Sequence, residues 1–157
     1  MDVGTLLSRL GELLRGQTRR LRPHEEAIFA AIRERLDSRE RDVLDRQIAV
    51  RPLIQRSHGN RMVLFAFDGG RQERIPLFDN RDDEHCLARA HLRSGSSRNV
   101  VLLMIHRGRL SSLEFRRTLQ HLHAASLEVR DVTLHVEQPT VANAIDRLEH
   151  GRGDGDG

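Results

Sequence analysis

The stretch VVLLMIHRGRLSSLEF, residues 100–115, is the most hydrophobic part of the sequence and decides the fold. Its first six residues are all apolar. A charged connection that carries Gly108 separates them from a second run, in which Leu113 and Phe115 share one face. Two short runs joined in this way are typical of a β-hairpin, because glycine adopts the positive φ of tight turns without steric cost. The sequence therefore predicts a core built on this hairpin.

The two faces of each predicted strand indicate its place in the sheet. Residues 61–67 are apolar on both faces, as is the first half of the hairpin, and such strands belong inside a sheet. We therefore expect these two strands to be neighbours at the sheet centre. The second half of the hairpin carries Ser111, Ser112 and Glu114, so we expect it nearer an edge or a solvent face.

Helical spacing precedes the strands. After Pro23, apolar residues recur every four positions from Ile28 to Leu36. Asp37 with Glu40 forms a capping-box pattern, which predicts the start of a second helix that ends before residue 52. Two helices with so short a connection make a helical hairpin.

The remaining segments complete an α+β domain over residues 1–150. We predict strands over residues 53–57, 74–78 and 127–136, the last with a bulge near residues 130–131 where its apolar phase changes.

Asp82 and Asp83 are expected to cap a helix that runs to about residue 93, followed by a flexible loop over residues 94–97. A final helix follows Pro139, and residues 151–157 form a disordered Gly/Asp tail. The expected fold is a mostly antiparallel sheet of about five to six strands with an N-terminal helical hairpin and a C-terminal helix.

The charge of the chain is modest, although its isoelectric point is about 10.6. All 26 basic residues are arginine, against 23 acidic residues, and the chain has no lysine, tyrosine or tryptophan. Little titrates between the thiol and arginine, so a small surplus keeps the isoelectric point high. Residues 51–110 nevertheless hold 11 arginines and 6 acidic residues, which indicates a moderately basic face.

Several classes of protein do not fit the sequence. No apolar run approaches the ~20 residues of a membrane span. The N-terminus lacks a basic region before its spaced leucines, so we expect no signal peptide. The single cysteine, Cys86, forms no internal disulfide, and a cytoplasmic location is expected.

The sequence contains no specific catalytic, metal or cofactor motif, and we predict no catalytic residue, metal or cofactor. Cys86 lies near acidic residues and His91, but its neighbours match no nucleophile or metal signature. His121 and His123 would share a face on an extended segment, yet no third ligand can be named.

The first hypothesis is therefore a non-catalytic protein-binding or accessory protein, with self-association as a further option. Its expected interaction surface combines the leucine stripe of a helical arm over residues 1–16 with the charged turn of the hairpin: Leu6, Leu10, Leu13, Arg107 and Arg109. The alternative for the leucine stripe, which its helical spacing favours, is packing into the core of the fold. The alternatives are a small hydrolase or metal enzyme using His and Asp, and weak nucleic-acid binding. The latter would use the central arginines Arg71, Arg74, Arg81, Arg89, Arg93, Arg98, Arg107 and Arg109.

Overall fold

The hairpin predicted over residues 100–115 is present. The computed structural model describes residues 17–67, 75–119 and 124–136. In it, β5 (Ser97–His106) and β6 (Arg109–Phe115) are joined by Arg107 and Gly108, both with positive φ. That geometry suits a two-residue hairpin turn, and it confirms that Gly108 has the positive φ predicted for it.

Within the described residues, an antiparallel sheet of seven strands runs in the order β1-β2-β3-β6-β5-β4-β7. The other strands are β1 (Gln17–Thr18), β2 (Leu53–Arg56), β3 (Met62–Ala66), β4 (His85–Ser94) and β7 (Leu127–Val136). The short helical turns η1 (His58–Asn60) and η4 (Ala124–Ser126) precede β3 and β7. Without the two-residue β1, the sheet has the predicted size, and the α+β class is confirmed.

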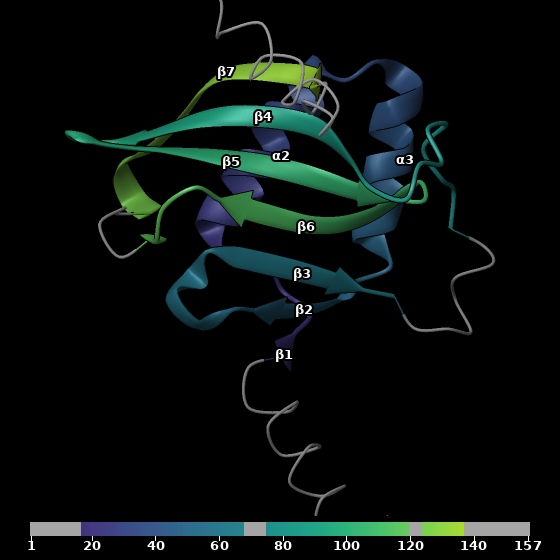
Figure 1. Cartoon of the computed structure of the whole chain (residues 1–157), viewed down its shortest axis with the longest axis horizontal. Helices are drawn as coiled ribbons and strands as arrows, with labels where there is room; N and C mark the ends of the chain where they lie inside the picture. The colour runs from purple at the N-terminus through teal and green to yellow at the C-terminus, as the bar shows by residue number, and fades with distance from the viewer. Residues whose placement is uncertain (1–16, 68–74, 120–123, 137–157) are drawn as a thin grey trace, which may run out of the picture.

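The two helices of the described part are α2 (Pro23–Arg35) and α3 (Ser38–Ala49). Both lie behind the sheet in Figure 1, on the same face. Asp37 caps α3 as expected, since its carboxylate accepts the Glu40 N–H at 2.8 Å. The core lies between these helices and the sheet, where Ile28 and Ile32 of α2 are fully buried with Val101, Leu103 and Ile105 of β5. Alternate residues of the strands point to the opposite, open face.

The predicted helix from Asp82 to about residue 93 is wrong, because this segment forms β4. Ala88, Ala90 and Leu92 are buried on the helix side, and the residues between them are exposed. This alternation by two is the signature of a strand with one covered face. The expected loop over residues 94–97 is the tight β4–β5 turn, in which Gly95 has φ +59°. The strand predicted over residues 74–78 is also absent from the described part of that segment, residues 75–78.

The predicted order of the central strands is also wrong. β3 pairs with β6, not β5, through Val63–Leu113 and its neighbours. Of the two positions expected for the second half of the hairpin, the edge is wrong and the solvent face is confirmed, because Ser112 and Glu114 lie on the open face of an internal strand.

The bulge predicted near residues 130–131 of β7 is confirmed. The pairing of β7 with β4 shifts there, and Asp131 has φ +48°. The shift lets apolar residues on both sides of the bulge pack towards the core: Leu127, Val129, Val132 and Leu134. The predicted arm over residues 1–16, the C-terminal helix after Pro139 and the tail over residues 151–157 lie outside the described residues.

Candidate functional site

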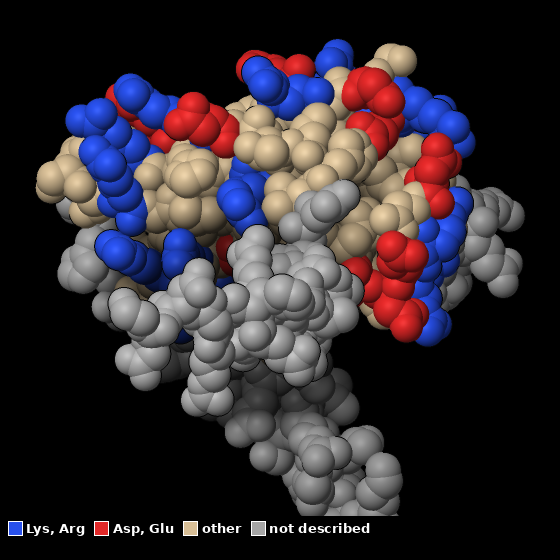
Figure 2. Space-filling model, turned by 45° about the horizontal axis from the view of Figure 1, so that its top comes forward, with Lys and Arg blue, Asp and Glu red and all other residues tan. Residues whose placement is uncertain are grey.

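Arginine side chains collect on the open face of the sheet, at the end formed by the β4–β5 turn. Arg89, His91 and Arg93 alternate with the buried residues of β4, so all three are exposed on the side away from the helices. In the ladder, Arg93 stands opposite Arg98 of β5. Figure 2 shows blue side chains gathered at this left end of the described surface, whereas blue and red alternate at the other end.

Two adjoining hollows mark this surface, which we call the arginine face. The end hollow, of about 410 Å³, is lined by His91, Leu92, Arg93, Arg98, Asn99, Val100, Arg116, Arg117, Arg130 and Asp131. The central hollow, of about 480 Å³, is lined by Arg61, Arg89, His91, Val100, Leu102, Glu114, Phe115 and Arg116. Three lining residues are common to both, so the two hollows form one depression across the strands.

The charge of this depression is strongly unbalanced. Among the described residues, seven arginines line it against two acidic residues, Glu114 and Asp131. Arg130 is ion-paired with Glu128, and Arg93 donates from Nε to the Gly95 carbonyl at 3.1 Å. Four further guanidinium groups make no hydrogen bond or ion pair within the described part of the chain: those of Arg89, Arg98, Arg116 and Arg117.

The turn that carries Arg116 and Arg117 is held in place by a buried amide. Asn99, only 5% exposed, donates from Nδ2 to the Arg117 carbonyl at 2.9 Å and accepts the Arg117 N–H at 3.0 Å. Its Oδ1 also accepts the Val100 N–H at 2.8 Å. Arg61 donates from Nη2 to the Arg116 carbonyl at 3.2 Å. These bonds fix the backbone from which both arginines extend.

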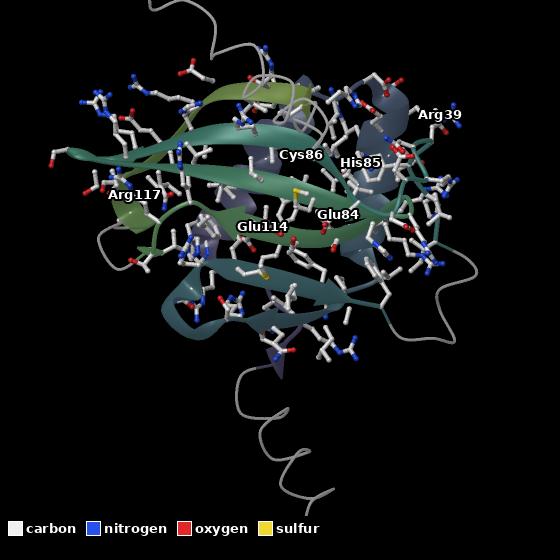
Figure 3. All side chains as sticks on the ribbon, viewed as in Figure 1. Arg39, Glu84, His85, Cys86, Glu114 and Arg117 are labelled. Carbon is white, nitrogen blue, oxygen red and sulfur yellow. The ribbon has the colours of Figure 1, made fainter. Side chains whose placement is uncertain are left out.

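The middle of the sheet differs from its end. Glu114 stands between Met62 and Leu102 on the open face and accepts a hydrogen bond from Ser112 Oγ at 3.0 Å. Figure 3 shows Glu114 near the middle of the sheet and Arg117 at its left end. Leu64, 39% exposed, lies two residues after Met62 in β3, opposite Ser112. The central hollow therefore combines a carboxylate with apolar contacts.

The residues that the sequence singled out as an interaction surface lie elsewhere. Arg107 lies in the β5–β6 turn and Arg109 follows it, at the opposite end of β5 from Arg98. Arg107 is ion-paired with Asp83 at 2.7 Å, and its guanidinium lowers the pKa of that carboxyl. Leu6, Leu10 and Leu13, like Arg71 and Arg74, lie outside the described residues.

The β5–β6 turn is anchored by the buried side chain of Gln47. Its Nε2 donates to the carbonyls of Pro76 at 2.8 Å and Gly108 at 3.0 Å, and its Oε1 accepts the Leu110 N–H at 2.6 Å. The Arg107 N–H donates to the Asp82 carbonyl at 2.9 Å. The charged turn is thus tied to α3 and to the chain before β4, which is a structural role.

Cys86 does not have the environment of a catalytic thiol. It is buried, and burial raises its pKa, while its S–H donates to the Ala88 carbonyl at 3.3 Å. Activated thiols need the opposite shift. His91, the nearby histidine considered from the sequence, lies on the arginine face.

The histidines of the described segments do not gather into a metal site. His135 lies 3.0 Å from Glu40, and burial lowers the pKa of His85. Nevertheless, no group of three or more His, Cys, Asp or Glu side chains in the described segments is arranged to hold a metal ion. His121 and His123 lie outside these segments.

Sequence reasoning found three of the seven arginines of this face: Arg89, Arg93 and Arg98. It missed the four that come from just before β3, from just after β6 and from β7: Arg61, Arg116, Arg117 and Arg130. The alternation of arginine and histidine with small apolar residues in β4 was the available signal, and the predicted helix obscured it.

Comparison with protein-family models, curated proteins and solved structures gave no significant match. Among the described residues, no helix is long and apolar enough to cross a membrane.

Proposed function

We propose that this protein is a non-catalytic binding module that holds an acidic segment of a partner protein on its arginine face. The observation that carries the proposal is the set of seven arginines around one depression, four of them with unpaired guanidinium groups among the described residues. Arginine suits this task because its planar fork donates two parallel hydrogen bonds to a carboxylate. The single buried cysteine is compatible with a cytoplasmic setting.

A protein segment fits this surface better than a nucleic acid does. Glu114 in the central hollow would repel a continuous phosphate backbone, whereas a polypeptide can place a neutral or basic residue there. Leu64 and Leu102 offer apolar contacts beside the arginines. Single-stranded nucleic acids need exposed aromatic rings for stacking. The chain has no tryptophan or tyrosine, four of its phenylalanines are buried and Phe67 is half-buried.

The proposal is tested by fluorescence anisotropy with a labelled peptide of alternating Glu and Val residues. We expect binding that weakens steeply as salt is added, because charged contacts at an exposed interface are screened. The double variant Arg98→Gln/Arg116→Gln is expected to lose roughly tenfold in affinity. The matched variant Arg39→Gln removes an exposed arginine of α3, paired with Asp79 at the opposite end of the sheet, and is expected to bind like the parent.

A labelled single-stranded oligonucleotide of mixed sequence provides the comparison between the two ligand classes. Tighter binding of the oligonucleotide than of the acidic peptide would favour the nucleic-acid alternative. Equal loss of peptide affinity in the Arg98→Gln/Arg116→Gln and Arg39→Gln variants would show that the arginine face is not the binding surface.

A further inference from the structure

We propose that the end hollow of the arginine face is a subsite for a phosphate monoester, carried by a phosphorylated side chain of the partner protein. This inference rests on the proposed function and specifies the ligand chemistry of one part of the same surface. It depends on the difference between the two hollows, on the number of guanidinium groups at one end, and on how that end is held.

The arginines of the end hollow come from four separate parts of the sheet. Arg93 extends from β4, Arg98 from β5 and Arg130 from β7, while Arg116 and Arg117 follow directly after β6. They surround a space of about 410 Å³. Convergence of one side-chain type from so many elements provides several donor directions, as a ligand with several acceptor atoms requires.

The charge around the end hollow exceeds what one carboxylate can balance. Asp131 is the only acidic residue among its described lining residues. Because Arg130 is already paired with Glu128, the surplus remains on Arg93 and on the three arginines without described partners: Arg98, Arg116 and Arg117. A carboxylate has two oxygens and one charge. A phosphate monoester carries a charge of about −1.5 to −2 and three strong acceptor oxygens, so it can engage two guanidinium forks together.

The end hollow is also held in shape before any ligand arrives. Asn99 bonds the backbone of Arg117 in both directions, and Arg61 bonds the carbonyl of Arg116. The bond from Arg93 Nε to the Gly95 carbonyl restrains that guanidinium beside the β4–β5 turn. Restraints of this kind reduce the conformational entropy lost on binding and therefore favour recognition of a compact, highly charged group.

The central hollow is unsuited to the same group. Its lining includes the carboxylate of Glu114, which would repel a dianion, and the apolar side chain of Leu102. The two hollows share His91, Val100 and Arg116, so a ligand can occupy both at once. The geometry thus places the phosphate at the end of the sheet and the unphosphorylated neighbouring residues of the partner over β5 and β6.

The experiment is an NMR titration of the full chain labelled with ¹⁵N, using three small probes. They are N-acetyl-O-phosphoserine amide, N-acetyl-aspartate amide and inorganic phosphate. We expect the phosphoserine probe to bind roughly tenfold more tightly than the aspartate probe, since more charge-assisted hydrogen bonds form. The largest shifts are expected at amides around the end hollow, including Val100 and Arg117. Arg98→Gln/Arg116→Gln should remove this preference, and Arg89→Gln, which changes only the central hollow, should keep it.

The possible results separate this inference from the proposed function. Equal affinity for the phosphoserine and aspartate probes would overturn the phosphate subsite and leave the acidic-peptide function intact. Failure of both probes together with failure of the Glu/Val peptide would overturn both. Inorganic phosphate binding more tightly than the phosphoserine probe would show that the hollow takes a free anion. Tighter binding of an oligonucleotide than of a phosphoserine peptide would assign the hollow to nucleic acid, and either result contradicts the inference.

Discussion

Arg93 of β4 and Arg98 of β5 stand directly opposite each other in the antiparallel ladder. Like charges in this position destabilise a sheet. Glu128, opposite Arg93 on its other side, is already paired with Arg130. We therefore expect the pair to reduce the stability of the fold while it concentrates positive charge at the end hollow.

The variant Arg98→Glu tests whether this pair lowers the stability of the fold while it favours binding of an anion. It replaces a repulsive cross-strand pair with an attractive one, so we expect the free energy of unfolding to rise by about 0.5 kcal/mol. Binding of the phosphoserine probe should be lost in the same variant. Arg117→Glu is the matched control: it lies beyond the end of β6, so it should weaken binding without the gain in stability. Urea denaturation and the NMR titration measure both effects. A loss of stability in Arg98→Glu would contradict this account of the pair.

Gly108 and Gly95 predict different costs for the same substitution. Both have positive φ, +78° and +59°. A Cβ on Gly108 would lie 2.8 Å from the Phe78 carbonyl oxygen, whereas nothing lies within 4 Å of a Cβ on Gly95. We expect Gly95→Ala to cost about 1 kcal/mol from backbone strain alone, and Gly108→Ala to cost at least about 2 kcal/mol more because the docked turn must move. Equal urea midpoints for the two variants would mean that the turn is not docked as described.

Part of the fold could be predicted from the sequence because single residues marked it. Gly108 marked the hairpin, Asp37 marked the start of α3, and the broken phase around Asp131 marked the bulge. Each of these is a local effect of backbone geometry or capping, so the necessary residues are adjacent in the chain. The segment of β4 was predicted as a helix because Asp82 and Asp83 resemble a helix cap.

The arginine face could not be derived in the same way. Its arginines become neighbours only through the order β3-β6-β5-β4-β7, and Arg61 lies far from Arg130 in sequence. The polar residues of β6 indicated either an edge or a solvent face, and only the order of the strands shows that they lie on the open face of an internal strand. Because β4 was predicted as a helix, the cross-strand position of Arg93 opposite Arg98 could not be predicted either. Long-range strand pairing, not local propensity, creates this site.

The buried ion pair between Glu25 and Arg56 predicts the largest loss of stability from a single charge removal. Arg56 donates from Nε and Nη2 to the two carboxylate oxygens, at 2.7 and 2.6 Å, and the Glu25 side chain is 0% exposed. Arg56→Met should cost about 3–5 kcal/mol, because it leaves a buried carboxylate without its partner. The matched variant Arg33→Met removes an exposed pair with Asp45 and should cost less than about 1 kcal/mol.

A double variant separates the cost of an unpaired buried carboxylate from the cost of losing the packed arginine side chain. In Glu25→Gln/Arg56→Met no charge remains buried, and the amide oxygen can still accept the Arg22 N–H that Glu25 accepts at 2.8 Å. We therefore expect the double variant to be more stable than Arg56→Met in chemical denaturation. If Arg56→Met unfolded no more easily than Arg33→Met, the pair would not be buried in solution.

His24 and His85 predict how stability changes with pH. Burial lowers the pKa of both histidines, against opposing effects from Glu25 and Asp82 respectively. Each folded-state pKa is below the unfolded value of about 6.5, so the unfolded chain binds the extra proton first. Their contribution to stability is therefore complete above about pH 6.5 and is lost as pH falls through that value towards the folded-state pKa.

His24→Gln/His85→Gln should lose less stability than the parent between about pH 7 and about pH 5, as measured by urea midpoints. His106→Gln, at an exposed position, is the control and should follow the parent curve. An unchanged acid-side slope in the double variant would contradict the burial of both imidazoles.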